Sequence, residues 1–388
     1  MNYDFFAPAQ IVFGWGRRSE LGKLAVQLGR RVFLISGSRT LQRSGVIDAA
    51  VRTLEEKGLT VQPFAVPSHE PEVVDVDSLV ADLLRHNPST DDVVVAIGGG
   101  STIDLAKAAA AIARNRHGST VVDFLEGVGK GLQITERPLN VIAVPTTAGT
   151  GTEVTKNAVI SSYQPAFKKS LRSDWMIPRI VLVDPELTVS LSREITAYTG
   201  MDAITQLIES YISRRAAPIP RALALSGLKL AIPALPLVVR QPTSREGREA
   251  MSHAALLSGL ALANSGLGLA HGVAAALGVT CRVPHGLACA TMLPTALRVN
   301  RSVREQDLAN LEREFDPRSE SNADLADGFL RRIEALCQEI GIPSRLRDLG
   351  VTIDQLPELV KGSRGNSMSG NPRDVSDDEL FKLLRDLW

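Results

Sequence analysis

The feature that most constrains the fold is a change in hydrophobic patterning near residue 187. Before that point, short runs rich in β-branched residues alternate with helical stretches. The predicted strands are residues 31–36, 60–66, 92–97, 140–144 and 179–183, and the predicted helices are residues 46–57, 73–85 and 102–113. This alternation predicts a mostly parallel sheet with helices on its faces.

After residue 187 the β-rich runs disappear. Long stretches rich in Ala and Leu, broken by Gly and Pro, predict helices at residues 195–213, 221–237, 246–264 and 267–277. The polar segment 319–326 is expected to be a surface loop or the start of a helix. Because 388 residues exceed one ordinary core, we predict two domains: an α/β domain over residues 1–187 and an all-α domain over residues 188–388.

Composition narrows the function classes. Lys and Arg together number 43 and so do Asp and Glu, so no excess charge favours a nucleic-acid partner or an anionic membrane. The odd set of Cys281, Cys289 and Cys337 lacks CxxC spacing, which disfavours a disulfide framework and a thiolate zinc site. The first ten residues lack the pattern of a signal peptide. We therefore expect a cytoplasmic protein without a nucleic-acid or membrane partner.

A glycine-rich turn follows the predicted strand 92–97. Gly98, Gly99, Gly100 and Ser101 stand between that strand and the helical stretch that begins at Thr102. Glycine lets the backbone approach a phosphate closely, and a helix N-terminus offers free N–H groups and a positive dipole end. The turn therefore indicates a pyrophosphate site. A plain connection between a strand and a helix also needs glycine, and that reading stays open.

A second polar segment, residues 145–153, follows the predicted strand 140–144. It is rich in Thr and Gly and includes Thr146 and Thr147. Hydroxyls and accessible amides at this density suit a diphosphate or a ribose. The alternative is a polar surface loop.

The helical half contains a candidate divalent-metal site. Asp202 and Gln206 are four residues apart in a predicted helix and share one face. His271 lies in a helix of small residues, and His285 follows Pro284 at a turn into the next helix. One carboxylate and two imidazoles from separate helices form a reasonable metal site. Taken alone, each histidine is more commonly structural than a ligand.

Together, these motifs resemble those of the iron-containing (group III) alcohol dehydrogenases. The motifs, in the order and spacing of that family, are GGGSTIDLAK, PTTAGTGTEVT, DPELT, GMDAITQLIESYIS, GLGLAHG and VPHGLACATMLP. The resemblance extends from Pro8 to Arg373, essentially the whole chain. It implies an NAD(P)-dependent oxidoreductase that moves a hydride between a nicotinamide and a small alcohol or aldehyde.

The resemblance also implies a fold and roles for particular residues. The fold is an α/β nucleotide-binding domain followed by a helical domain, the architecture of dehydroquinate synthase. By position, Gly98–Ser101 and Asp104 would hold the pyrophosphate, Thr146 and Thr147 would flank the nucleotide, and Lys168 would lie near the ribose. Asp202, His271 and His285 would hold Fe²⁺ or Zn²⁺, which acts as a Lewis acid on the substrate oxygen. A homodimer is expected on the resemblance alone.

Two residues depart from the family pattern. Gln206 stands where the family has its fourth metal ligand, a histidine, and an amide oxygen is a weaker, neutral donor. Ala275 stands where many members have another histidine near the substrate. Metal occupancy is therefore in doubt. A metal-independent reductase, in which His271, His285 and Gln206 donate hydrogen bonds to the same oxygen, stays open as an alternative.

The choice of coenzyme depends on the loop after the first predicted strand. An acidic residue there would bind the ribose 2′-hydroxyl of NAD and repel a 2′-phosphate, but the loop contains Gly37, Ser38 and Arg39. Gly37 leaves room for a 2′-phosphate, and Ser38 and Arg39 can bind one. The sequence is therefore compatible with either NAD or NADP as the coenzyme. Arg39 can equally be a solvated loop charge.

Two further functions remain as alternatives. One is a non-catalytic nucleotide-binding relative, in which Gln206 and Ala275 mark a site that has lost its chemistry. The other is a lyase resembling dehydroquinate synthase, although its basic and carboxylate residues are not recognisable here.

Overall fold

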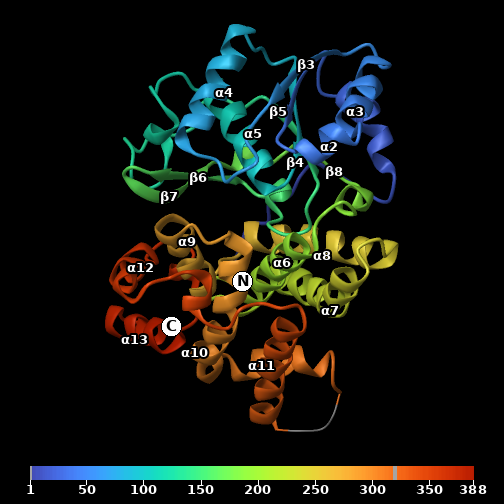
Figure 1. The fold of residues 1–388 in the computed structure, drawn as a ribbon. Helices are drawn as coiled ribbons and strands as arrows, with labels where there is room; N and C mark the ends of the chain where they lie inside the picture. Colours follow the sequence, from blue (N-terminus) through green and yellow to red (C-terminus); the bar gives the residue numbers. More distant parts are fainter. Residues whose placement is uncertain (1, 318–320) are drawn as a thin grey trace. The chain divides into compact units, whose positions relative to one another are not determined.

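The computed structural model describes residues 2–317 and 321–388 (Figure 1). The chain forms two compact units, and each is described by itself. The α/β unit comprises Phe6–Thr147 and Gly151–Ser190, and the helical unit comprises residues 2–5, Ala148–Thr150 and the chain from Leu191 onward. The α/β unit thus extends slightly past residue 187, and a short inner segment groups with the helices.

The α/β unit is built on a six-stranded parallel sheet (Figure 1). Its strands stand in the order β1 (Gln10–Phe13), β8 (Ile180–Val183), β5 (Asn140–Pro145), β4 (Asp92–Gly98), β2 (Arg31–Ser36) and β3 (Thr60–Ala65). The five predicted strands therefore form, and β1 is an additional edge strand that periodicity did not reveal.

Helices cover both faces of this sheet, because successive strand residues point to opposite faces. The helices of the unit are α1 (Leu21–Ala25), α2 (Arg39–Arg43), α3 (Val46–Glu55), α4 (Val73–Arg85) and α5 (Gly100–Ile112). Phe33 and Ile35 pack with α4 and α5 in one core. Val32 and Leu34 pack with α1 and α3 in the other. The predicted parallel sheet between helical layers is confirmed.

An antiparallel hairpin, β6 (Asn157–Tyr163) and β7 (Ala166–Arg172), lies outside the main sheet and was not predicted. Its buried residues Ala158, Ile160 and Leu171 join the core of α4 and α5. The apolar runs in these strands are short, Ala158–Ile160 in β6 and Ala166–Phe167 in β7, which concealed the strands from a search for longer apolar runs.

The second unit is helical, as predicted. Its helices are α6 (Arg193–Ile212), α7 (Pro218–Arg240), α8 (Arg245–Ala263), α9 (Leu269–Cys281), α10 (His285–Arg313), α11 (Asn322–Glu339), α12 (Leu356–Gly362) and α13 (Asp377–Leu387). Each of these helices contributes buried side chains to one core. The predicted segment 319–326 lies partly outside the described residues; its remainder begins α11, where the Ser321 hydroxyl accepts a hydrogen bond from the Asp324 amide.

One helix of the described chain, α7, is long and apolar enough to cross a membrane by length and composition alone. Its residues Leu228, Ala231 and Leu235 are fully buried in the core of the helical unit. The apolar character of α7 is therefore explained by packing against its neighbouring helices.

Candidate functional site

Three loops of the α/β unit meet at the carboxyl edge of the parallel sheet. They follow Ser36 at the end of β2, Gly98 at the end of β4 and Pro145 at the end of β5. In the sheet register Ser36 pairs with Ile97, and Gly98 pairs with Pro145, so the three strands end at the same level. The parallel pairing thus gathers the three segments that the motifs single out.

The loops after β2 and β4 flank the switch point of the sheet. From β2 the chain continues outward to β3 and then returns to β4 on the other side of β2. Ligands of open α/β sheets bind where the strand order reverses in this way, outside the carboxyl ends of the strands. The position of these loops therefore favours ligand binding over a plain connection.

Gly37 and Gly98 are glycines because Thr102 fills the space beside both. A Cβ atom on Gly98 would lie 2.5 Å from the Thr102 Cβ, and one on Gly37 would lie 2.5 Å from the Thr102 hydroxyl oxygen. The two loops are thus packed against the first turn of α5. Gly99 is less restricted, since its Cβ would first meet the Thr147 Cγ2 at 3.2 Å.

The N-terminus of α5 is open to an anion. Gly99 is its N-cap and has no side chain that could accept from the first amides. Gly99, Gly100 and Ser101 are only half-buried. Free amides and the positive end of a 13-residue helix favour a phosphate at this position.

The loop after β2 forms the start of α2. The Ser38 hydroxyl accepts a hydrogen bond from the Leu41 amide and caps the helix, while Arg39 is exposed at the first helical position. Ser38 is therefore occupied as a cap in this structure, and Arg39 is the group at this loop that can reach a solvent-side anion.

The segment after β5 belongs to both units. Thr146 is buried and its amide donates to the Gly98 carbonyl at 3.0 Å, which ties this loop to the glycine turn. Thr147 is half-buried. The next three residues, Ala148–Thr150, group with the helical unit. A polar surface loop would not be tied down at both ends in this way.

Asp104 and Lys168 have partners inside the α/β unit. The Asp104 carboxylate accepts hydrogen bonds from the Thr152 hydroxyl and from the Val159 amide. Lys168, on β7, donates to Glu70 at 2.6 Å. Asp104 thus stabilises the loop that follows β5, and the contact of either residue with a dinucleotide stays a prediction.

Lys107 and Glu153 form a buried charge network beneath the same loop. The Lys107 ammonium donates to the Thr152 carbonyl at 2.9 Å and to the Thr155 hydroxyl at 3.0 Å. Burial lowers the pKa of Lys107 to about 8, although Asp104 and Glu153 oppose the shift. Burial likewise raises the pKa of Glu153 to about 7. Both residues lie within the two polar motifs, but neither had a predicted role.

The raised pKa of Glu153 predicts a pH dependence of stability. Between pH 4.5 and about 7 the folded chain keeps a proton that the unfolded chain releases, so the free energy of unfolding falls as pH rises through this range. In Glu153→Gln we expect the fall in the free energy of unfolding with rising pH to be smaller by roughly 2 kcal/mol. Chemical denaturation at pH 5 and pH 8 measures it.

The control for this prediction is Glu56→Gln, at an exposed position of the same unit. Its unfolding free energy should follow that of the unmodified chain at both pH values. Parallel pH profiles for Glu153→Gln and the unmodified chain would contradict the assignment of the pH dependence to Glu153.

In the helical unit, Asp202, His271 and His285 converge. Asp202 lies on α6, His271 on α9 and His285 at the first position of α10. The Nε2 atom of His271 is 3.3 Å from an Asp202 oxygen, and the Nε2 atom of His285 is 3.9 Å from the same oxygen. Cys289 joins the group: one potential ligand atom from each of the four residues lies within 4.8 Å of the others.

Glu209 fixes the orientation of His271. Its carboxylate accepts hydrogen bonds from the His271 Nδ1 at 2.7 Å, from the Gly268 amide at 2.9 Å and from the Ala270 amide at 2.8 Å. The carboxylate therefore stabilises the N-terminus of α9 and leaves the Nε2 atom of His271 directed at Asp202. Glu209 lies two helical turns after Asp202 on α6, which is the sequence signal that could have revealed it.

The cluster is an environment for positive charge. Asp202 and Glu209 are both buried. Burial opposes a charge on His271, but the Cys289 sulfur and hydrogen bonds to Asp202 and Glu209 outweigh burial and raise the pKa of His271 well above its ordinary value. Two buried carboxylates need a compensating cation, either a protonated imidazole or a metal ion.

The side chain of Gln206 makes other contacts. Its amide nitrogen donates to the Thr150 carbonyl at 3.0 Å, and its amide oxygen accepts from the Ser258 hydroxyl at 3.4 Å. Its part as a metal ligand stays a prediction. Ala275 is half-buried on α9, one turn after His271, and has no side-chain group that could relay a proton.

The residues of the cluster fit a divalent ion. Carboxylate oxygen and imidazole nitrogen are ligands that Fe²⁺ and Zn²⁺ take in proteins. A carboxylate on the second nitrogen of a histidine, as Glu209 is on His271, is typical of metal-bound imidazole. His285 is about a quarter exposed, whereas Asp202 and His271 are almost fully buried, so solvent reaches the cluster at His285.

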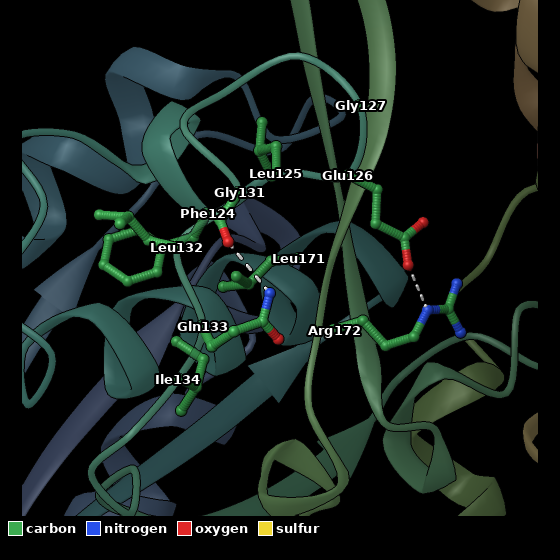
Figure 2. A pocket seen from close by; sticks show the side chains of 10 residues that line it. All are labelled: Phe124, Leu125, Glu126, Gly127, Gly131, Leu132, Gln133, Ile134, Leu171 and Arg172. Carbon is green, nitrogen blue, oxygen red and sulfur yellow. Dashed lines mark hydrogen bonds and ion pairs between the residues drawn. The ribbon is translucent and has the colours of Figure 1, made fainter.

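A separate hollow of about 410 Å³ lies in the α/β unit (Figure 2). Its lining includes Phe124, Leu132 and Leu171, and the Glu126 carboxylate accepts from the Arg172 guanidinium at 2.7 Å beside it. None of the residues that the motifs single out lines this hollow. It is therefore distinct from the glycine turn.

Comparison with known proteins assigns the family. Residues 8–185 match the family model described as iron-containing alcohol dehydrogenase, and residues 196–388 match the C-terminal model of the same family. NAD-dependent methanol dehydrogenase of Bacillus methanolicus is 30% identical over 98% of this chain and 99% of its own length. NADPH-dependent butanol dehydrogenase of Clostridium saccharobutylicum is 29% identical over 98% and 96%.

A solved structure of 1,3-propanediol oxidoreductase superposes over 100% of both chains, with a TM-score of 0.93 and 29% sequence identity. Family models, relatives and this structure together span both units. The chain therefore belongs to the iron-containing alcohol dehydrogenase family and is an oxidoreductase.

Proposed function

We propose that the chain is a metal-assisted, NAD(P)-dependent alcohol dehydrogenase or aldehyde reductase for small substrates. The observation that carries this proposal is that the Nε2 atoms of His271 and His285 converge on one buried carboxylate oxygen of Asp202. Family relatives named for methanol and butanol support a small primary alcohol or the corresponding aldehyde as substrate.

Asp202, His271 and His285 would hold Fe²⁺ or Zn²⁺. A bound divalent ion supplies Lewis-acid stabilisation of the oxygen that gains or loses negative charge during hydride transfer. Asp202 contributes the negative charge that retains the ion, and Glu209 keeps the Nε2 lone pair of His271 directed at it. The solvent-accessible side at His285 would admit the substrate oxygen.

The dinucleotide would bind at the carboxyl edge of the sheet. The amides of Gly99, Gly100 and Ser101 at the start of α5 would bind the pyrophosphate. Thr146 and Thr147 would flank the nucleotide, and Lys168 would lie near the ribose. The strand register that brings these loops to one level supports this arrangement.

Coenzyme choice provides a prediction at Arg39. Its exposed guanidinium at the first position of α2 can bind a 2′-phosphate, so the enzyme would accept NADP(H) as well as NAD(H). We expect Arg39→Asp to weaken NADPH binding about tenfold or more, because a carboxylate repels the phosphate, and to change NADH binding little. Calorimetric titration with both coenzymes measures this.

Arg43→Asp is the matched control, since Arg43 is also an exposed arginine of α2 but lies in its last turn. It should leave both affinities nearly unchanged. Equal loss of NADPH and NADH affinity in Arg39→Asp would show that Arg39 does not select the coenzyme.

The assembly and compartment form part of the same proposal. We propose a cytoplasmic homodimer. The three cysteines, which are free thiols in the structure, support a reducing compartment. Light scattering of the purified protein tests the assembly, and a monomer mass would overturn that part.

The experiment that tests the function combines metal analysis with a coenzyme-linked screen. Purified protein loaded separately with Fe²⁺ and Zn²⁺ is assayed with short aldehydes and alcohols and with NADH and NADPH. We expect turnover that depends on metal and is lost after chelation. Full activity in metal-free protein would remove the metal from the proposal, and coenzyme binding without turnover across the screen would identify a non-catalytic relative.

A further inference from the structure

A buried cysteine lies among the metal-site residues. Cys289 is fully buried, and its sulfur is 3.7 Å from the Nε2 atom of His285. The two residues stand four apart on α10, so both project from one face of the helix. Buried cysteines usually serve as small apolar side chains. Here, however, the Cys289 sulfur lies within 4.8 Å of a potential ligand atom of each of Asp202, His271 and His285.

We propose that the Cys289 thiolate is the fourth protein ligand of the metal ion, beside Asp202, His271 and His285. This inference rests on the metal part of the proposed function. It assigns the centre one oxygen, two nitrogen and one sulfur donor.

The distances among the four donors fit one ion. A tetrahedral ion with bonds of about 2.0–2.3 Å separates its ligand atoms by roughly 3.3–3.8 Å. Three of the six separations are 3.3 Å from His271 to Asp202, 3.9 Å from His285 to Asp202 and 3.7 Å from Cys289 to His285, and none of the six exceeds 4.8 Å. Small side-chain adjustments therefore bring all four atoms to bonding distance of a common centre.

The contacts of Gln206 support the assignment to Cys289. The Gln206 amide binds the Thr150 carbonyl and the Ser258 hydroxyl, and thereby stabilises the segment Ala148–Thr150. Moving its oxygen onto a metal would break the contact with the Ser258 hydroxyl. Cys289 needs no such exchange, because it already lies within the cluster.

A thiolate changes which metal the site prefers. Cysteine sulfur is a soft donor that favours Zn²⁺ and related transition ions and disfavours Mg²⁺, Ca²⁺ and Mn²⁺. On binding, the S–H bond breaks, a sulfur–metal bond forms, and the proton leaves to solvent. The accessible side at His285 would leave a bound ion open to the substrate oxygen.

Cobalt spectroscopy of the full chain tests the proposal. Metal-free protein is titrated with one equivalent of Co²⁺, and its absorption is followed in the visible and near-ultraviolet. We expect a sulfur-to-cobalt charge-transfer band in the unmodified protein. Cys289→Ser should lose this band, keep the visible cobalt bands and bind Zn²⁺ at least about tenfold more weakly.

Three matched variants complete the test. Cys337→Ser makes the same change at another buried cysteine of the helical unit, and Cys281→Ser makes it on α9; both should keep the charge-transfer band. Gln206→Leu should also keep it.

The outcomes separate this inference from the proposed function. Stoichiometric Co²⁺ without a charge-transfer band in the unmodified protein would overturn the role of Cys289 alone, whether or not any variant folds. Persistence of the band in Cys289→Ser would do the same. Failure of the unmodified protein to bind Co²⁺ would overturn both the role of Cys289 and the metal part of the proposed function.

Discussion

Asp202→Asn is expected to lose its metal ion and nearly all activity. The substitution keeps the shape of the side chain but removes the negative charge that faces His271 and His285. Because the carboxylate both attracts the cation and supplies a ligand oxygen, we expect metal affinity to fall at least about 100-fold. We expect kcat/KM to fall about 10²–10³-fold, the range for losing one stabiliser of a developing oxyanion.

Elemental analysis and steady-state kinetics of the Fe²⁺- or Zn²⁺-loaded variant check this result. Asp378→Asn serves as the control, because Asp378 is exposed in the first turn of α13. It should retain full metal content and activity. If Asp202→Asn retained its activity without metal, the reaction would proceed through hydrogen-bond donors instead, which is the metal-independent alternative.

Gly98→Ala is expected to weaken dinucleotide binding about 10- to 100-fold, since small misplacements of binding groups have effects of this size. The added Cβ would lie 2.4 Å from the Thr102 hydroxyl oxygen and 2.5 Å from the Thr102 Cβ. Rotation of the Thr102 side chain cannot relieve the second contact, because the Cβ is fixed to the backbone of α5. The first turn of α5 must therefore move, and with it the amides proposed to bind the pyrophosphate.

Calorimetric titration with NADH checks this expectation, and thermal unfolding reports the accompanying loss of stability, about 1–3 kcal/mol for an overpacked site. Gly365→Ala is the control, because a Cβ there meets nothing within 4 Å and its backbone is not in the left-handed region. Unchanged NADH affinity in a folded Gly98→Ala protein would mean that the pyrophosphate does not bind at the start of α5.

The regular elements of the fold were largely predictable from local patterns. The alternation of apolar strands with amphipathic helices gave β2 and α4 with their observed bounds, and the change of patterning near residue 187 anticipated the helical unit. β6 and β7 escaped prediction because their apolar runs are short and are followed by Ser or Lys. β1 is short and only partly buried, so periodicity gives little signal.

The candidate metal site was predicted in part. Asp202, His271 and His285 were identified from the residue types and from the family resemblance, and they do converge. Cys289 and Glu209 were missed, since a cysteine among alanines looks like core and a glutamate within a helix looks like solvated surface. Their positions, one turn after His285 and two turns after Asp202, place each of them on the helix face of a predicted ligand, and this spacing could have revealed them.

Glu209 connects the chemistry of the centre with the integrity of a helix. The carboxylate that orients His271 also accepts the amides of Gly268 and Ala270, so α9 and the metal site share one anchoring group. Ion binding would then stabilise the backbone hydrogen bonds at the beginning of α9. Slower amide exchange at the beginning of α9 in the metal-loaded protein would therefore report metal occupancy without any turnover. Mutations that destabilise this helix would lower the metal affinity even if every ligand were intact.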